Sequence, residues 1–234
     1  MHGTGYFWRP ELTNGDRMHR VRPLPTYLAK RLDRWRATTF SENKEWFSHL
    51  AAHGQHPRAM FISCCDSRVD PVAMFEGEPG DFFLVRNVAN LVPRYAPDEE
   101  MHGTSAAIEY AVTVLGVSHI VVMGHSGCGG VAACLDKCEG NAPALTDPKS
   151  FIGRWMDVLK PGYERIKDQG KTREDRIDLL EKEGVKVSIQ NLLSFPFVAE
   201  AVEEKRLSLH GLWTNIGSGE MVMYDGDGQA FREV

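Results

Sequence analysis

The chain lacks the marks of a secreted, membrane-spanning or nucleic-acid-binding protein. Its five cysteines are few and odd in number among 234 residues, so we expect reduced thiols and a cytoplasmic location rather than a disulfide framework. The most apolar stretch, residues 120–124, is far too short to cross a bilayer, and nothing near the first residue resembles a signal peptide. A formal net charge of −5 offers no basic face to a nucleic acid. None of these absences argues against a protein that acts on a small molecule.

What is present suffices for a globular fold. Hydrophobic residues make up 42% of the chain and charged residues 25%, which suits one domain of generous size or one domain with an arm. The first 25 residues hold three prolines among aromatic and basic residues, which indicates an irregular arm; from Pro25 to His53, apolar residues recur at helical spacing. We therefore predict an N-terminal arm with helices over residues 1–53 and an α/β domain over residues 54–234.

Three short apolar runs, at residues 59–63, 81–85 and 119–123, are predicted to be strands. Their apolar residues are continuous rather than alternating, which is typical of strands buried on both faces of a parallel sheet. Residues 104–115 predict a helix, with Thr104 or Ser105 as its N-cap and a glycine just beyond its end. Strands alternating with helices predict an α/β fold, a mainly parallel sheet flanked by helices.

The last third of the chain is predicted to be helical and then to close the sheet. Within the mostly helical residues 151–204, we expect the highly charged segment 171–183 to be a solvated face, and Pro196 to begin a new helix. Residues 206–213 and 221–224 alternate more and are separated by glycines, which predicts a hairpin at one edge of the sheet.

Two motifs carry candidate chemistry, and each begins just beyond a predicted strand. The first runs from Cys64 to Arg68 and the second from His125 to Cys128. Functional groups of open α/β sheets gather at the carboxyl ends of the strands, so the two motifs can converge. Zinc takes thiolate and imidazole ligands, and three protein ligands leave a fourth position open for catalysis. One cysteine of the first motif, with His125 and Cys128, supplies that number, and an ion pair with Arg68 would hold Asp66 where it can accept a hydrogen bond from a zinc-bound hydroxide.

The other cysteines are assigned structural roles. A lone cysteine is usually a small core residue, so either motif alone would be weak evidence for a metal. Cys65 would point away from Cys64 if the strand continues, which predicts a core position. Cys134 and Cys138 lie four residues apart on a predicted helix with no histidine between them, which favours packing over metal binding.

Three motifs together resemble the β class of carbonic anhydrases. They are Cys64-x-Asp66-Ser-Arg68, Arg86-Asn-Val-Ala-Asn90 and His125-Ser-Gly-Cys128-Gly-Gly, within a similarity that extends over about residues 55–224. The resemblance implies that Cys64, His125 and Cys128 hold Zn²⁺ and that Asp66 and Arg68 form a catalytic dyad. It also implies attack of zinc-bound hydroxide on carbon dioxide, giving bicarbonate and a proton. Homodimers or assemblies of dimers, in which the N-terminal arm wraps a partner subunit, are implied as well.

Some further residues of the chain resemble those of the plant-like branch of that family. Gln55, Phe83 and Tyr110 occupy positions that resemble its substrate pocket, where the glutamine would donate a hydrogen bond to a carbon dioxide or bicarbonate oxygen and the two rings would form an apolar wall. Core packing explains the two rings equally well.

One departure from the family concerns inhibition. The other branch binds regulatory bicarbonate through a tryptophan, an arginine and a tyrosine, and here Phe61 and Thr214 replace the first and the last, while Arg86 remains. We therefore expect no bicarbonate-driven state in which Asp66 binds zinc.

Two other functions share these motifs. A hydrolase of carbonyl sulfide or carbon disulfide on the same scaffold would keep the same ligands. A non-catalytic protein stabilised by zinc would need a fourth protein ligand, and Asp66 is the only obvious one. A cysteine-based redox protein is disfavoured because the chain has no Cys-x-x-Cys pair.

Overall fold

The structure is a computed structural model that describes residues 22–97 and 102–234. The chain separates into two compact units, one up to His53 and one from Gly54 onward. The irregular arm predicted for residues 1–25 falls mostly outside the described residues. The assignment of residues 1–53 as an arm and of residues 54–234 as a catalytic domain stays a prediction.

The described part of the first unit consists of helices without a buried core. α2 (Thr26–Trp35) continues into a π-helical turn, η1 (Arg36–Phe40), and α3 (Lys44–His53) follows. The rings of Trp35 and Phe40 lie 5.4 Å apart between centroids, yet no residue of these three elements is buried. The predicted helical spacing is confirmed, but helices that bury nothing gain little stability from their own packing.

The second unit is built on a six-stranded sheet in the order β2-β1-β3-β4-β5-β6 within the described residues. The first four strands of that order are parallel, and the last two are antiparallel to their neighbours. This confirms the predicted mainly parallel α/β fold. The strands are β1 (Ala59–Cys64), β2 (Phe82–Asn87), β3 (His119–His125), β4 (Ser208–Thr214), β5 (Met221–Asp225) and β6 (Ala230–Glu233).

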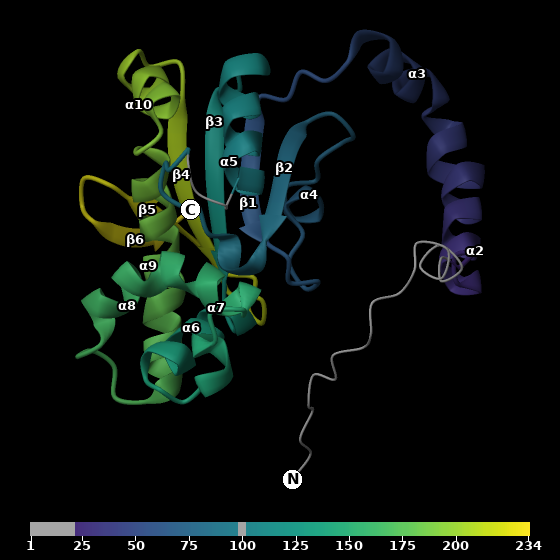
Figure 1. Cartoon of the computed structure of the whole chain (residues 1–234). Coiled ribbons are helices and arrows are strands. Elements are labelled where there is room, and N and C mark those ends of the chain that lie inside the picture. The colour runs from purple at the N-terminus through teal and green to yellow at the C-terminus, as the bar shows by residue number, and fades with distance from the viewer. Residues whose placement is uncertain (1–21, 98–101) are drawn as a thin grey trace. The chain divides into compact units, whose positions relative to one another are not determined.

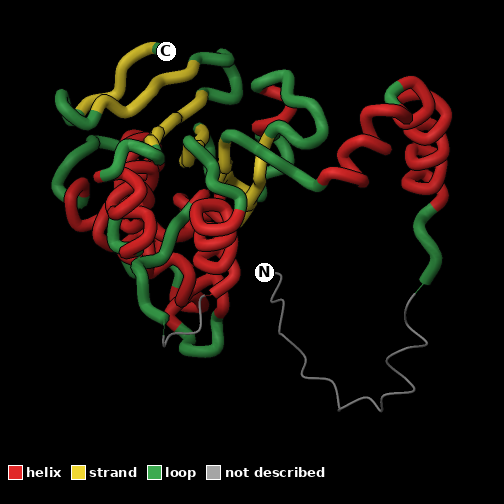
Figure 2. The backbone as a smooth tube through the Cα atoms, turned by 90° about the horizontal axis from the view of Figure 1, so that it is seen from above, coloured by secondary structure: helices red, strands yellow, loops and turns green. Residues whose placement is uncertain are grey.

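Helices connect the parallel strands, and most of them gather on one side of the sheet (Figures 1 and 2). Residues of α5, α9 and α10 bury one face of β1 and β3 in the largest apolar cluster. No helix in the described part of the chain is long and apolar enough to cross a membrane. The helices and helical turns are α4 (Pro71–Met74), η2 (Val88–Asn90), α5 (His102–Glu109), η3 (Tyr110–Val114), α6 (Gly129–Cys138), η4 (Pro143–Thr146), α7 (Phe151–Met156), η5 (Asp157–Leu159), α8 (Lys160–Ile166), α9 (Arg173–Leu192) and α10 (Pro196–Glu203).

Capping residues, proline and glycine in the sequence predicted some helix ends correctly and others wrongly. Pro196 is the first residue of α10, and Gly116 adopts a positive φ of 64° just after η3, as expected. The N-cap expected at Thr104 or Ser105 is wrong, because α5 already begins at His102. A capping residue type marks where a helix can start, but not whether an earlier start is available.

Two predictions for the C-terminal third are corrected by the tertiary structure. The hairpin formed by β4 and β5 exists, but β4 lies inside the sheet next to β3, and β6 forms the edge. The segment 171–183 is not simply a solvated face, because Glu181 and Glu183 of α9 are buried. Glu183 accepts hydrogen bonds from Lys186 of the same helix and from Arg165 of α8, and a charge pattern along the sequence cannot show the partner on α8.

A pair of histidines on adjacent strands should make stability depend on pH. Nδ1 of His119 and Nε2 of His210 lie 3.1 Å apart, and burial, together with the nearby His119, lowers the pKa of His210 below 6.5. The unfolded chain therefore takes up this proton at a higher pH than the folded one, so the folded state loses stability as the pH falls below about 6.5. We expect the Tm of the wild-type protein to fall more between about pH 7 and pH 5 than that of His210→Gln. Thermal unfolding measured across this range checks it, and parallel curves would contradict it.

Candidate metal centre

The carboxyl ends of β1 and β3 bring the two motifs together. Cys64 is the last residue of β1 and His125 the last of β3, and these strands are parallel neighbours. Cys128 lies three residues further on, at the N-cap of α6, which Figure 1 shows beside these strand ends. Candidate ligand atoms of the three residues all lie within 4.8 Å of one another, and all three residues are buried. We call these three residues the metal cluster.

The turn between His125 and Cys128 depends on Gly127 and Ser126. Gly127 adopts a φ of 66°, in the left-handed region that favours glycine. The Ser126 hydroxyl oxygen accepts a hydrogen bond from the backbone N–H of Ile216 at 2.9 Å, which ties the turn to the loop after β4. The turn thereby directs both ligand side chains into one buried space.

The donor atoms fit a cation that prefers sulfur and nitrogen. The Sγ atoms of Cys64 and Cys128 lie 3.9 Å apart, close to the distance of about 3.8 Å that two Zn–S bonds of about 2.3 Å span at a tetrahedral angle. Nδ1 of His125 must donate to the carbonyl of Ser126 at 3.0 Å, because a carbonyl only accepts. Nε2 of His125 therefore carries a free lone pair, and it is buried without a hydrogen-bond partner in the described part of the chain. A zinc ion would satisfy this orphaned acceptor.

Because the two thiols lie close together, their pKa values are shifted in opposite directions. The hydrogen bond between the two sulfur atoms lowers the pKa of Cys64 from 9.0 to about 4. The same pairing, with burial, raises the pKa of Cys128 far above its usual value. Two thiolates at this distance repel each other in a buried site, so the second ionises readily only when a cation offsets the first.

Asp66 borders the metal cluster and is held by Arg68. The guanidinium donates from Nε to Oδ1 at 2.9 Å and from Nη2 to Oδ2 at 2.7 Å, and Nη2 also donates to the Gly127 carbonyl at 3.0 Å. These hydrogen bonds keep the pKa of Asp66 well below its usual value. Oδ2 of Asp66 lies 4.0 Å from Nε2 of His125, so the carboxylate faces the cluster while both its oxygens remain bonded to Arg68.

The Arg86 side chain already donates hydrogen bonds to backbone carbonyls of its own chain. Its guanidinium donates to the carbonyls of Cys64, Asp66 and Val69 at 2.9, 2.7 and 2.6 Å, which fixes the loop after β1. The Thr214 hydroxyl likewise donates to a backbone carbonyl, at 3.1 Å. The absence of bicarbonate-driven inhibition stays a prediction, and it is supported by these engaged donors.

Glu181 is a residue of the site that sequence reasoning missed. Its Oε1 accepts a hydrogen bond from the backbone N–H of Cys128 at 2.9 Å, and its Oε2 accepts one from the indole of Trp213 at 3.1 Å. Burial raises the pKa of Glu181 above its usual value. The only signal in the sequence is its position four residues before Val185, which places it on the buried face of α9.

A strained turn forms one wall of the centre. Ala89 and Asn90 both adopt positive φ values, of 64° and 48°, and both are buried. Hydrogen bonds from other helices hold the turn: the Trp155 indole donates to the Val88 carbonyl at 2.8 Å, and the Ser188 hydroxyl donates to the Asn90 carbonyl at 3.1 Å. Consecutive left-handed residues other than glycine persist only where their surroundings fix them, and such strain is common at functional sites.

The predicted substrate residues do not lie at the metal cluster of the same chain. On β2, Asn87 pairs with Cys64, and Phe83 lies four residues before Asn87. Four residues of a strand correspond to about 13 Å along the sheet. Phe83 stacks on Tyr110, with ring centroids 5.9 Å apart. Gln55 is exposed ahead of β1. Their role in binding substrate stays a prediction.

The remaining cysteines do not join the cluster. The core position predicted for Cys65 is wrong: β1 ends at Cys64, the chain turns, and Cys65 is exposed. Cys134 is buried on α6, where its thiol donates to the carbonyl of Met156 at 3.6 Å, and Cys138 is half-buried. Both therefore pack as predicted.

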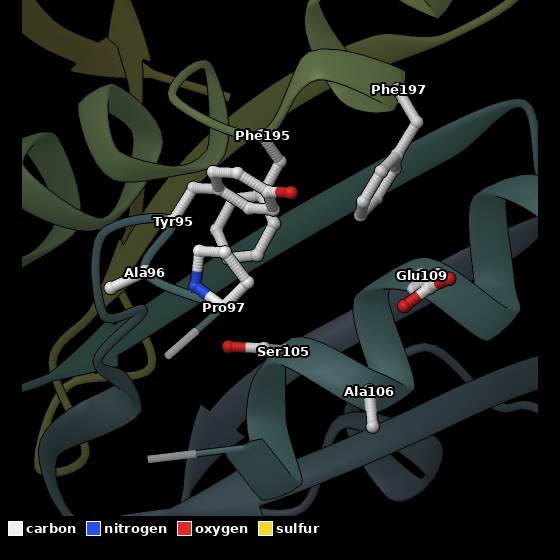
Figure 3. A pocket seen from close by; sticks show the side chains of 8 residues that line it. All are labelled: Tyr95, Ala96, Pro97, Ser105, Ala106, Glu109, Phe195 and Phe197. Carbon is white, nitrogen blue, oxygen red and sulfur yellow. The ribbon is translucent and has the colours of Figure 1, made fainter. Parts of the chain in front are cut away.

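A separate cavity of about 360 Å³ lies between aromatic side chains (Figure 3). Tyr95, Phe195 and Phe197 line it together with Ser105 and Glu109. The rings of Tyr95 and Phe195 meet edge to face, with centroids 5.5 Å apart. Among its described lining residues there is no member of the metal cluster and no predicted substrate residue, so this cavity lends no support to the predicted pocket.

Comparison with known proteins identifies the family. The family model for carbonic anhydrase matches residues 59–221, and the chain is 36% identical over 196 residues to β-carbonic anhydrase 3 of Arabidopsis thaliana, covering 82% of this chain and 74% of that protein. The chain belongs to the β-class carbonic anhydrases. The fold of this carbonic anhydrase is similar to that of the β-carbonic anhydrase CcaA, with a TM-score of 0.76, 32% identity and coverage of 89% and 91% of the two chains. A tetrameric β-carbonic anhydrase of Sordaria macrospora gives a TM-score of 0.72 with 31% identity over 85% of this chain and 95% of that one.

Proposed function

We propose that this carbonic anhydrase is a zinc enzyme that hydrates carbon dioxide reversibly at Cys64, His125 and Cys128. The observation that carries the proposal is the buried cluster, in which an unpartnered imidazole nitrogen faces two thiols. Membership of the family supplies the reaction class. Three protein ligands leave room for a solvent ligand, which suits catalysis better than a closed structural site.

Each residue near the cluster has a proposed part in the reaction. When bound, zinc supplies Lewis acidity that makes water a competent nucleophile near neutral pH. Two thiolates and the neutral imidazole would hold the metal and balance its charge. Asp66 would accept a hydrogen bond from the attacking water or hydroxide and so orient it toward carbon dioxide. Arg68 keeps that carboxylate ionised and in place.

Substrate binding by Gln55, Phe83 and Tyr110 would require a second copy of the chain. These residues lie along the sheet from the cluster of their own chain, so contact with a reacting carbon dioxide would place them at the cluster of a partner. This favours homodimers or assemblies of dimers, and the relative from Sordaria macrospora is described as tetrameric. The free cysteines support a reducing, cytoplasmic setting.

Stopped-flow hydration of carbon dioxide by purified protein, with its zinc content measured, tests the proposal. We expect about one zinc ion per chain and bicarbonate formation well above the uncatalysed rate. Release of hydrogen sulfide from carbonyl sulfide and carbon disulfide, assayed on the same sample, distinguishes the hydrolase alternative. Folded protein without zinc, or hydrogen sulfide release without carbon dioxide hydration, would overturn the proposal.

A further inference from the structure

We propose that Glu181 is a positioning residue, which fixes the peptide of Cys128 and thereby the place where the Cys128 sulfur meets the metal. The inference rests on the proposed function, because it takes Cys64, His125 and Cys128 as zinc ligands. It concerns a side chain outside the three motifs, on a helix that begins 45 residues after Cys128.

The contacts of Glu181 link three parts of the chain. Its carboxyl group accepts hydrogen bonds from the backbone N–H of Cys128, the N-cap of α6, and from the indole N–H of Trp213 on β4, at 2.9 and 3.1 Å. The side chains are almost fully enclosed, since Glu181 is 2% exposed and Trp213 is 4% exposed. Lys182 places its Nζ 4.4 Å from the centre of the Trp213 ring, which helps to hold the indole in position.

Close packing of α9 on the sheet brings Glu181 within reach. Gly124 of β3, one residue before His125, has no side chain, and a Cβ there would come 2.9 Å from Cγ2 of Val185. Trp213 is the register partner of Gly124 on β4. Helix α9 therefore lies directly against the strand that carries the histidine ligand, and the carboxyl group extends from it to the next ligand.

The chemistry of the carboxyl group explains why this position should affect the metal. Both of its oxygens accept hydrogen bonds from N–H groups that have no access to solvent, so removing either acceptor leaves a buried donor unpaired. Relief of that penalty requires a shift of the Cys128 peptide or of the indole. The Cys128 sulfur moves with its peptide, and outer hydrogen-bond partners of metal ligands typically change metal affinity by about 10–100-fold.

Glu181→Gln tests the inference on the zinc-loaded, full-length protein. Glutamine offers one acceptor oxygen, and its NH₂ group must face either Cys128 N–H or the Trp213 indole, which are both donors. We expect zinc to be lost to a chelator about 10–100 times faster than from the wild type. We also expect the thiolate-to-metal absorption bands of the Co²⁺-substituted protein to shift, because they report the positions of the sulfurs.

Two further variants separate positioning from stability. Glu183→Gln removes another buried carboxylate of α9, whose partners are Arg165 and Lys186, and should leave zinc loss and the Co²⁺ spectrum unchanged even where Tm falls. Trp213→Phe keeps the Cys128 hydrogen bond but removes the second anchor of Glu181, and should accelerate zinc loss to a smaller extent. If Glu181→Gln does not fold, the rate of zinc loss from Trp213→Phe decides whether the inference holds.

The possible outcomes distinguish this inference from the proposed function. Wild-type rates of zinc loss in Glu181→Gln and Trp213→Phe would overturn it. So would equal acceleration in Glu181→Gln and Glu183→Gln with equal falls in Tm, because a general loss of stability would then explain both. Wild-type protein that binds no zinc would instead overturn the proposed function, and that result is known before any variant is compared.

Discussion

Replacing Cys64 by serine is expected to remove zinc from the protein and, with it, the hydration of carbon dioxide. Serine keeps the shape of the side chain, but its hydroxyl does not ionise near neutral pH, whereas the pKa of Cys64 is lowered to about 4. Two protein ligands would remain, and the charge balance of the centre would be lost. We expect an activity loss larger than the roughly 10–100-fold that follows removal of an outer hydrogen-bond partner.

Cys65→Ser is the matched control for this experiment. It makes the same chemical change one residue later, at an exposed position outside the metal cluster. Zinc content by atomic absorption and stopped-flow hydration rates should match the wild type in this variant. Retention of zinc and activity by Cys64→Ser, or loss of both in Cys65→Ser, would show that the ligand set is wrongly assigned.

The parallel sheet could be predicted because β1 and β3 are buried on both faces, although β2, at the edge of the sheet, is only partly buried and Leu84 is exposed. Continuous apolar runs that end in polar or small residues marked β1, β2 and β3 to within two residues at each end. The convergence of Cys64 with His125 and Cys128 then follows, because neighbouring parallel strands end at the same edge of a sheet. Spacing and topology together are therefore enough to locate a centre whose ligands are more than sixty residues apart in the sequence.

Residues that act through tertiary contacts could not be predicted in the same way. Glu181 lies among charged neighbours, and its spacing from Val185 is the only local sign that it does not face solvent; its partner Cys128 is evident only once α9 is placed against β3. Arg86 was noted as the one residue that remains of the other branch's bicarbonate site, but the sequence did not show that its Nε and Nη2 donate to three carbonyls of the loop after β1. In both cases the role depends on which backbone groups lie within reach, and a sequence pattern does not contain that information.

Asp66→Asn is expected to slow hydration by about 100-fold or more, within the range lost when a positioned proton acceptor is removed. An amide has one acceptor oxygen, and its NH₂ group would face the donors of Arg68, so the bidentate pair cannot form. Zinc content should stay at the wild-type level, because Asp66 is not among the three cluster residues. Arg68 holds the pKa of Asp66 well below its usual value, so the carboxylate stays ionised above that value and its loss should cost the same factor from about pH 6 to pH 9.

Measurements of kcat and zinc content on two neighbouring variants complete this test. Ser67→Ala, at an exposed position between the two dyad residues, should behave as the wild type. Arg68→Lys keeps the positive charge but cannot donate two parallel hydrogen bonds, so we expect a smaller loss of kcat than in Asp66→Asn. If Asp66→Asn loses zinc together with activity, the carboxylate is a fourth metal ligand and the centre is closed. If instead it keeps full activity, the hydrogen bond that orients the nucleophile must come from another group.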